Sequence, residues 1–151
     1  MTPANSYDWT YLADTVMGGV SEGEAALHGE VLRLSGSVST ENRGGFIQAR
    51  TALPDGLPPA ATALRLRVRG NEQRYFIHLR TTGSRLPWQY YQAGFHAPLD
   101  WVDVTIPLAD FTPSGGMLRA RIRSEDIRSL GLVAYGRDHQ ADVSLAALGA
   151  I

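Results

Sequence analysis

The feature that most constrains the fold of this chain is a strict alternation of apolar and charged residues over residues 62–70. Leu64, Leu66 and Val68 alternate there with Arg65, Arg67 and Arg69. A period of two puts alternate side chains on opposite faces of a strand, whereas a helix would scatter them around its circumference. The segment is therefore predicted to be a strand with one core face and one solvent face.

Similar patterns predict strands along most of the chain. Strands are expected over residues 27–34, 45–53, 62–70, 74–82, 89–96, 101–107, 130–135 and 143–151. Gly and Pro punctuate these stretches at intervals of about ten residues, which is typical of β-sandwiches and barrels. One short helical turn is predicted at residues 124–127, with Ser124 as its N-cap. We therefore expect an all-β fold of about eight or nine strands, with residues 1–151 forming a single domain.

Composition excludes several classes of function. The chain has 151 residues, of which 44% are hydrophobic and 19% are charged, so it is expected to fold. Its net charge of -1 gives no general attraction to nucleic acid or to anionic lipid. No apolar run is long enough to cross a bilayer, so no membrane insertion is expected. Residues 1–21 contain no Lys or Arg and so lack the basic start of a secretory signal, which predicts a cytoplasmic location.

The sequence contains no recognisable catalytic or metal-binding constellation. There is no Cys, and the four His residues are far apart and form no metal-ligand spacing. No nucleophile elbow surrounds any Ser, and the glycine pairs lack the Lys and the strand-loop-helix context of a phosphate loop. We therefore expect a non-catalytic protein without a metal or a cofactor.

One local feature suggests a binding surface. Between Arg65 and Arg85 there are six Arg and one acid, Glu72, whereas residues 1–32 carry five acids and no basic residue. If the strands from residue 62 to residue 107 are consecutive neighbours, the alternation fixes their register. One outward row would then hold Arg65, His78, Gln92 and Thr105, and the next would hold Arg67, Phe76, Gly94 and Asp103. Arg80 would lie opposite Tyr90.

These outward residues define a candidate site for a ligand or a partner. Its members are Arg65, Arg67, Phe76, His78, Arg80, Tyr90 and Gln92. Aromatic rings stack on apolar ligand faces, while Arg and Gln bind oxygen atoms. The alternative is structural: Arg67 covers Phe76 by cation–π packing, and the other Arg residues are solvated strand positions. In a jelly roll successive strands can also cross to the opposite sheet, which would change the neighbours but not the inward or outward parity.

Two segments near the N-terminus carry a family resemblance. The first segment contains Trp9, Asp14, Met17, Gly18, Gly19 and Ser21, and the second contains Asn42, Gly44, Gly45, Phe46 and Arg50. In order and spacing they resemble the complex I intermediate-associated protein 30 family, and the resemblance continues over nearly the whole chain. It implies a galactose-binding-like jelly-roll β-sandwich. Mitochondrial members of that family are assembly factors that help to build respiratory complex I without known catalysis.

These motif residues are interpreted first as structural. Asp14 is expected to cap a turn, Met17 to pack into the core, and Gly18 and Gly19 to permit a bulge before the next strand. The alternative is that the motif is itself a partner site.

Two functions follow from these observations. The first is an assembly-factor or chaperone-like protein that binds a polypeptide partner, with respiratory-chain subunits as the partners that the resemblance implies. The second is a carbohydrate or small-ligand module that uses an outward sheet face.

Overall fold

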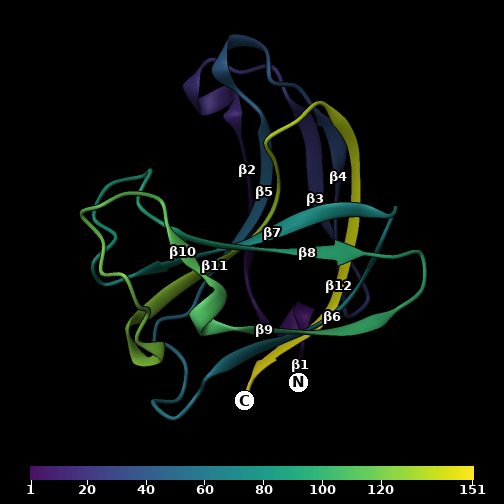
Figure 1. The fold of residues 1–151 in the computed structure, drawn as a ribbon. Coiled ribbons are helices and arrows are strands. Elements are labelled where there is room, and N and C mark those ends of the chain that lie inside the picture. Colours follow the sequence, from purple (N-terminus) through teal and green to yellow (C-terminus); the bar gives the residue numbers. More distant parts are fainter.

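The protein is a jelly-roll sandwich of two antiparallel β-sheets, seen in a computed structural model that describes residues 1–151 (Figure 1). Sheet A holds, in spatial order, β3 (Glu22–His28), β4 (Val31–Val38), β12 (His139–Ala150), β6 (Ala63–Gly70) and β9 (Val102–Pro107), with β1 (Thr2–Pro3) paired to β12. Sheet B holds β10 (Thr112–Pro113), β8 (Tyr91–Ala97), β7 (Gln73–Thr81), β11 (Ile127–Tyr135), β5 (Phe46–Ala52) and β2 (Trp9–Ala13). The all-β prediction is confirmed.

The connections contain only short 3₁₀ turns. These are η1 (Ala4–Ser6), η2 (Asp14–Met17), η3 (Glu41–Arg43), η4 (Leu108–Asp110) and η5 (Ser124–Asp126). The turn predicted near residue 124 is present, but Ser124 does not cap it. Its hydroxyl instead donates to the carbonyl oxygens of Pro58 and Pro59 and so ties a distant loop to the turn.

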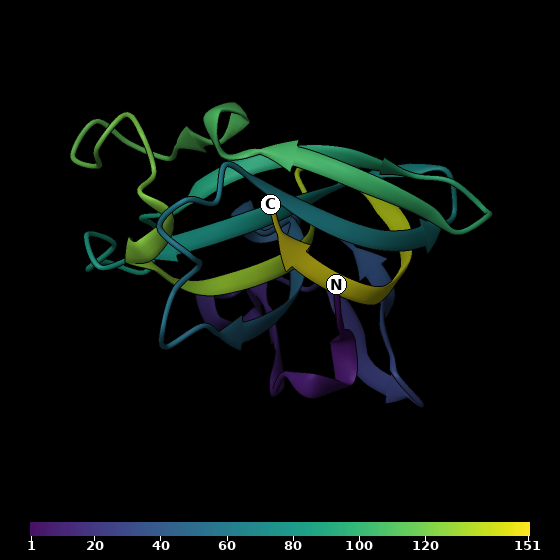
Figure 2. The same cartoon turned by 90° about the horizontal axis from the view of Figure 1, so that it is seen from below.

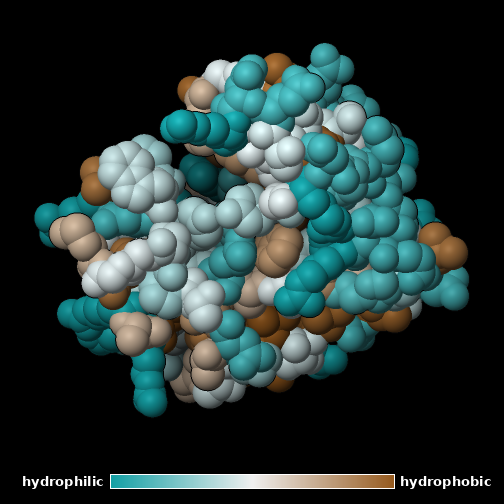
Figure 3. All heavy atoms as spheres, turned by 45° about the horizontal axis from the view of Figure 1, so that its top comes forward, coloured by the Kyte–Doolittle hydropathy of each residue, from teal (hydrophilic) through white to brown (hydrophobic).

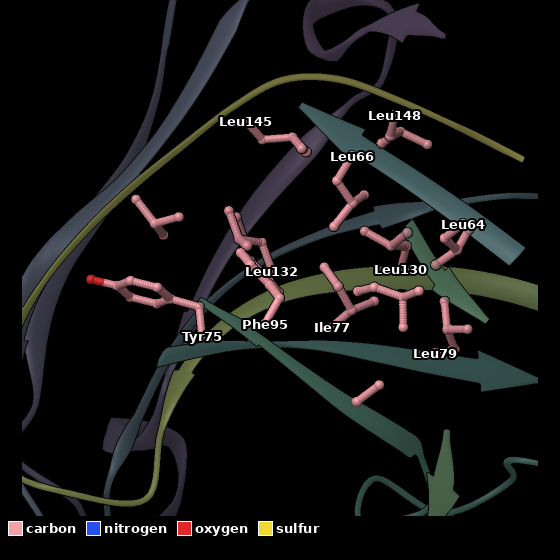
Figure 4. Close-up of a cluster of buried hydrophobic side chains, with 14 of the residues drawn as sticks. Leu64, Leu66, Tyr75, Ile77, Leu79, Phe95, Leu130, Leu132, Leu145 and Leu148 are labelled. Atoms are coloured by element: carbon pink, nitrogen blue, oxygen red, sulfur yellow. The ribbon is translucent and has the colours of Figure 1, made fainter. Parts of the chain in front are cut away.

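The core lies between the two sheets and contains 31 buried apolar residues (Figure 4). Leu64, Leu66 and Val68 contribute from sheet A, and Tyr75, Ile77 and Leu79 face them from sheet B. The predicted inward parity of these residues is therefore confirmed. Tyr75 also joins the sheets by hydrogen bonds, since its hydroxyl donates to Oδ1 of Asn71 at 2.5 Å and accepts from the backbone N–H of Asp142 at 2.8 Å.

Two sequence predictions about the strands are wrong. The strand expected over residues 27–34 spans a hairpin, in which a two-residue turn begins at Gly29 with φ of +61° and joins β3 to β4. The strands from residue 62 to residue 107 do not form one meander, because β6 and β9 belong to sheet A and β7 and β8 to sheet B. Alternation specifies which side of a strand is buried but not which strand lies beside it.

Sheet B is strongly bent. In Figure 1, β2 and β5 stand nearly upright, while β7 and β8 lie across the molecule. The view from below in Figure 2 shows the two layers, with the chain termini on sheet A. The outer face of sheet B, which points away from the core, is curved by this bend. Most of the predicted site residues lie on that face.

Candidate functional site

The candidate site is the outer face of sheet B, which we call the sheet B face. A row of paired residues crosses all six of its strands. In spatial order from β10 to β2 the row is Thr112, Gln92, His78, Gly131, Arg50 and Thr10. A neighbouring row contains Gly94, Phe76, Val133 and Gln48. These two rows form the floor of the site.

The structure brings together five of the seven predicted site residues. Phe76, His78, Arg80, Tyr90 and Gln92 belong to this side of β7 and β8. Arg65 and Arg67 do not join them, because β6 lies in the opposite sheet. Nε of Arg67 donates to Asp103 on β9 at 2.9 Å, and Nη2 of Arg65 lies 4.0 Å from the same carboxylate. The predicted single site is thus divided between two faces of the molecule.

Aromatic rings cluster around His78. The imidazole stacks on the ring of Tyr90, with centroids 4.0 Å apart and planes 12° apart. Tyr135 meets Phe76 edge-on at 5.8 Å and His78 at 6.1 Å. The predicted packing of Arg67 on Phe76 is absent, and Arg74 takes that place with its guanidinium 5.6 Å from the ring centroid.

His78 is a neutral hydrogen-bonding group in this cluster. Its Nε2 lies 2.7 Å from Oε1 of Gln92, to which it donates in the tautomer that carries the Nε2 proton. Burial, together with the nearby Arg50 charge, lowers the pKa of His78 to about 4 although the bond to Gln92 opposes this change. The imidazole is therefore uncharged at neutral pH and is suited to hold Gln92 and Tyr90 in place.

Besides Arg74, two other Arg residues of this face, Arg50 and Arg80, bring positive charge to the site, and their guanidiniums are held differently. Arg80 donates to the carbonyl oxygens of Ser84, Leu86 and Pro87 at 2.9 to 3.2 Å, so its guanidinium organises the connection between β7 and β8. Arg50 is half-buried, and its only side-chain hydrogen bond is a long one, from Nε to Gln48 at 3.4 Å. Burial and the nearby Arg80 charge lower the pKa of Arg50. Arg50 therefore has free donors on this face.

Two glycines make room on the floor. A Cβ on Gly131 would overlap the Gln48 amide, and a Cβ on Gly94 would overlap the Arg74 guanidinium. Glycine inside a strand marks such a close approach of neighbouring groups. In Figure 3 the surface is hollowed between the upper part of the molecule and the loops at its left. The sheet therefore presents a concave face with polar groups at its base.

Sequence reasoning missed three members of this site. Gln48 and Tyr135 received no role, and Arg50 was assigned to the structural motif. One signal for the floor was present, because Gly131 interrupts an apolar strand at a position where a side chain is expected.

The N-terminal motif forms a buried polar junction beside this face. The Asp14 carboxylate is fully buried and accepts from Ser21 N at 3.0 Å, Ser21 Oγ at 2.6 Å, Gly45 N at 2.6 Å and Phe46 N at 3.3 Å. Burial would raise the pKa of Asp14, but these hydrogen bonds outweigh it and lower the pKa. The expectation that Asp14 caps a turn is wrong, because η2 has no side-chain cap and the Asp14 carboxylate instead joins the two motif segments.

The other motif residues surround this junction. The indole of Trp9 donates to Ala4 O at 2.8 Å, and the Asn42 amide donates to Gly18 O at 3.2 Å. A Cβ on Gly19 or Gly44 would overlap the Asp14 carboxylate. The prediction that Met17 packs into the core is wrong, since it is 62% exposed beside Val16 at 73%. The 3₁₀ geometry of η2 and the αL conformation of Gly18 turn these side chains outward.

Two further findings concern metal binding and membrane spanning. No group of three or more His, Cys, Asp or Glu side chains lies close enough to hold a metal ion. None of the helical segments has the length and apolar character needed to span a membrane.

Comparisons with known proteins place the chain. The family model "Complex I intermediate-associated protein 30" matches residues 1–146. No curated protein matches the sequence of this chain.

Among solved structures, the family 11 carbohydrate-binding module of cellulosomal cellulase Lic26A-Cel5E from Clostridium thermocellum superposes with a TM-score of 0.73 at 15% identity, over 95% of this chain and 86% of that one. A family 11 module from Clostridium thermocellum with a bound β-1,3-1,4-mixed-linked tetrasaccharide gives 0.73 at 15% identity, over 95% of this chain and 88% of that one. A family 30 carbohydrate-binding module gives 0.59 at 13% identity, over 88% and 92%. These similarities show the fold that the chain shares with binding modules.

Proposed function

The chain belongs to the complex I intermediate-associated protein 30 family, and from that premise we propose that it is a non-catalytic binding protein that engages an acidic segment of a polypeptide partner through the sheet B face. The family connects the chain with assembly of respiratory complex I. The proposed partners are accordingly subunits or intermediates of that complex. Fold and family do not fix a partner, so the proposal depends on the chemistry of the site.

The observation that carries the proposal is the uncompensated charge of Arg50. Its guanidinium is half-buried and makes no ion pair, although desolvated charges are normally paired. The strands of sheet B contain four Arg, namely Arg50, Arg74, Arg80 and Arg128, and no Asp or Glu. Because the protein supplies no carboxylate on this sheet, a carboxylate from a partner would satisfy Arg50 in a bidentate geometry.

The remaining groups of the face fit the same partner. Phe76, Tyr90 and Tyr135 offer aromatic area of the kind enriched at protein interfaces. The oxygen of the Gln92 side chain is held by His78, so its NH₂ group is available to donate to a peptide C=O. An extended acidic segment lying in the hollow would therefore meet charge, apolar and amide groups together.

A second candidate function is carbohydrate binding. It is favoured by aromatic rings and amide side chains on one concave face, together with the fold shared with carbohydrate-binding modules. The two functions differ in their dependence on charge. An acidic peptide segment needs the positive charge of Arg50 to pair with its carboxylate, whereas a neutral glycan does not.

The test is affinity purification of the tagged protein from its native cells after mild crosslinking, with quantitative mass spectrometry. Arg50→Gln is compared with Arg67→Gln, which removes the same charge from the other sheet. We expect complex I subunits with the wild type and with Arg67→Gln, and about tenfold less with Arg50→Gln. Equal recovery from both variants would contradict the proposed face, provided that thermal unfolding confirms both are folded.

The alternative has its own readout. Affinity electrophoresis in gels that contain mixed-linked β-glucan, neutral agarose or xylan reports glycan binding directly. Retardation that survives Arg50→Gln, with no complex I subunit recovered, would establish the carbohydrate function in place of the first.

A further inference from the structure

A second cavity lies at one end of the sandwich, away from the floor of the sheet B face. It has a volume of about 380 Å³ and lies between the connection from β7 to β8 and the connection from β10 to β11. Four of its lining residues are Arg85, Arg119, Arg121 and Arg123, and the only acid is Asp126. The cavity therefore concentrates positive charge in a protein whose net charge is -1.

Most of this charge is uncompensated. The guanidiniums of Arg85, Arg119 and Arg121 make neither an ion pair nor a hydrogen bond, in contrast to the paired Arg residues of sheet A. Arg123 alone is partnered, by Glu125 at 2.8 Å and by Asp126 at 3.8 Å. Three cations thus line one cavity with all their donors free, a set that suits phosphate oxygens.

The backbone of the same segment adds further donors. Between Arg119 and Arg123 no main-chain N–H donates to another protein atom, because this stretch pairs with no strand. Free N–H groups beside Arg side chains are the usual components of an anion site. Four of these five residues line the cavity, so the unpaired N–H groups belong to its wall.

The loops that carry these donors are anchored. The buried Tyr91 hydroxyl donates to Arg119 O at 2.7 Å, and Leu118 is buried beside it. Across the cavity, the buried Gln89 side chain accepts from the N–H groups of Arg85 and Leu86 at 3.0 Å each. Anchored loops lose less conformational entropy when a ligand binds.

We propose that this cavity binds a small organic polyphosphate. Three free guanidiniums match more than one phosphoryl group, and the apolar lining residues Met117, Leu118 and Ile122 offer a surface for the organic part. The volume admits a small molecule and is too small for a folded partner. The site shares no residue with the floor of the sheet B face. A test of this proposal is therefore independent of a test of the proposed function.

The test is isothermal titration of the full chain with pyrophosphate, ADP and adenosine at about 0.15 M salt. We expect saturable one-to-one binding of pyrophosphate, tighter binding of ADP and none of adenosine. The double variant Arg119→Gln/Arg121→Gln should weaken both phosphate ligands by about tenfold or more. The control Arg67→Gln/Arg69→Gln removes the same charge from sheet A and should leave binding unchanged.

Each contrary result overturns a stated part of the proposal. Absence of saturable pyrophosphate binding, or equal weakening in the control variant, would overturn the site. Equal affinities for ADP and pyrophosphate would overturn the apolar contact and leave an inorganic anion site. Circular dichroism of both double variants, whose mutated side chains are exposed, verifies that they are folded.

Discussion

The hydroxyl of Ser21 donates a 2.6 Å hydrogen bond to the Asp14 carboxylate, and the two side chains are both buried. The Ser21 hydroxyl also accepts from Ser39 N at 2.9 Å. Since Asp14 additionally accepts from Gly45 N, this junction connects residues 14–21 with residues 39–45. The two N-terminal motifs are thus joined through one buried carboxylate.

Asp14→Asn should destabilise the protein by about 3 kcal/mol, because one amide oxygen would replace two charged oxygens and a new N–H₂ group would face existing donors. Urea unfolding followed by circular dichroism measures the effect. Asp8→Asn, at an exposed position, is the matched control and should change little. A similar loss in both variants would show that Asp14 has no special structural role.

Gly19→Val tests the same junction from its other side. Its Cβ would overlap the Asp14 carboxylate, so the variant must displace a buried charge and should lose about 2 kcal/mol or more. Gly115→Val introduces the same side chain where nothing lies within 4 Å of the added Cβ. Differential scanning calorimetry of the pair should show a lowered midpoint for Gly19→Val only, and equal midpoints would refute the predicted overlap.

The parity of the side chains could be predicted from the sequence, while strand neighbours could not. Alternation in residues 64–68 and 75–79 correctly assigned the buried face, because burial depends on local pattern. The assignment of Arg65 and Arg67 to the same surface as His78 failed because pairing depends on which connection crosses between sheets.

Two side-chain environments could not be predicted from the sequence, and both for the same reason. Arg50 follows a recognisable motif, and its half-buried charge becomes visible only when β5 and β11 are paired. The outward turn of Met17 likewise depends on η2, since a Met in an apolar stretch is normally buried. In both cases the environment of the side chain is created by residues far away in sequence.

Arg67→Ala should leave stability nearly unchanged, because exposed ion pairs contribute little. It should also leave partner recovery unchanged if binding uses the sheet B face. Thermal unfolding and the crosslinking assay measure the two effects. Loss of partner recovery by this variant would show that sheet A contributes to binding.

Arg80→Gln should loosen the connection between β7 and β8 with little effect on the core. Its guanidinium donates to three carbonyl oxygens of that loop, and a Gln side chain cannot reach all of them. Hydrogen exchange should become faster by about tenfold at Ser84 N and Gln89 N, whose hydrogen bonds close the loop. Arg85→Gln is the control in the same loop, and equal acceleration there would contradict the role of Arg80.

His78 should make the protein less stable as the pH falls from about 7 to 4. Burial lowers its pKa from 6.5 to about 4 in the folded state, so the unfolded chain binds a proton first. Stability from the neutral imidazole is therefore complete above pH 6.5 and is lost as the pH falls toward 4, by about 3 kcal/mol in total.

The measurement is the free energy of unfolding in urea at several pH values, for the wild type and for His78→Gln. A Gln at this position keeps a donor for Gln92 and does not titrate, so the slope below pH 6.5 should become smaller. The slope that remains comes from groups such as His139 and Asp14, whose pKa values are also lowered in the folded state. His28→Gln, at an exposed position, should retain the slope of the wild type. Equal slopes in the wild type and in His78→Gln would contradict this prediction. They would show that His78 is protonated as readily in the folded protein as in the unfolded chain, and that the cluster with Tyr90 is open to water.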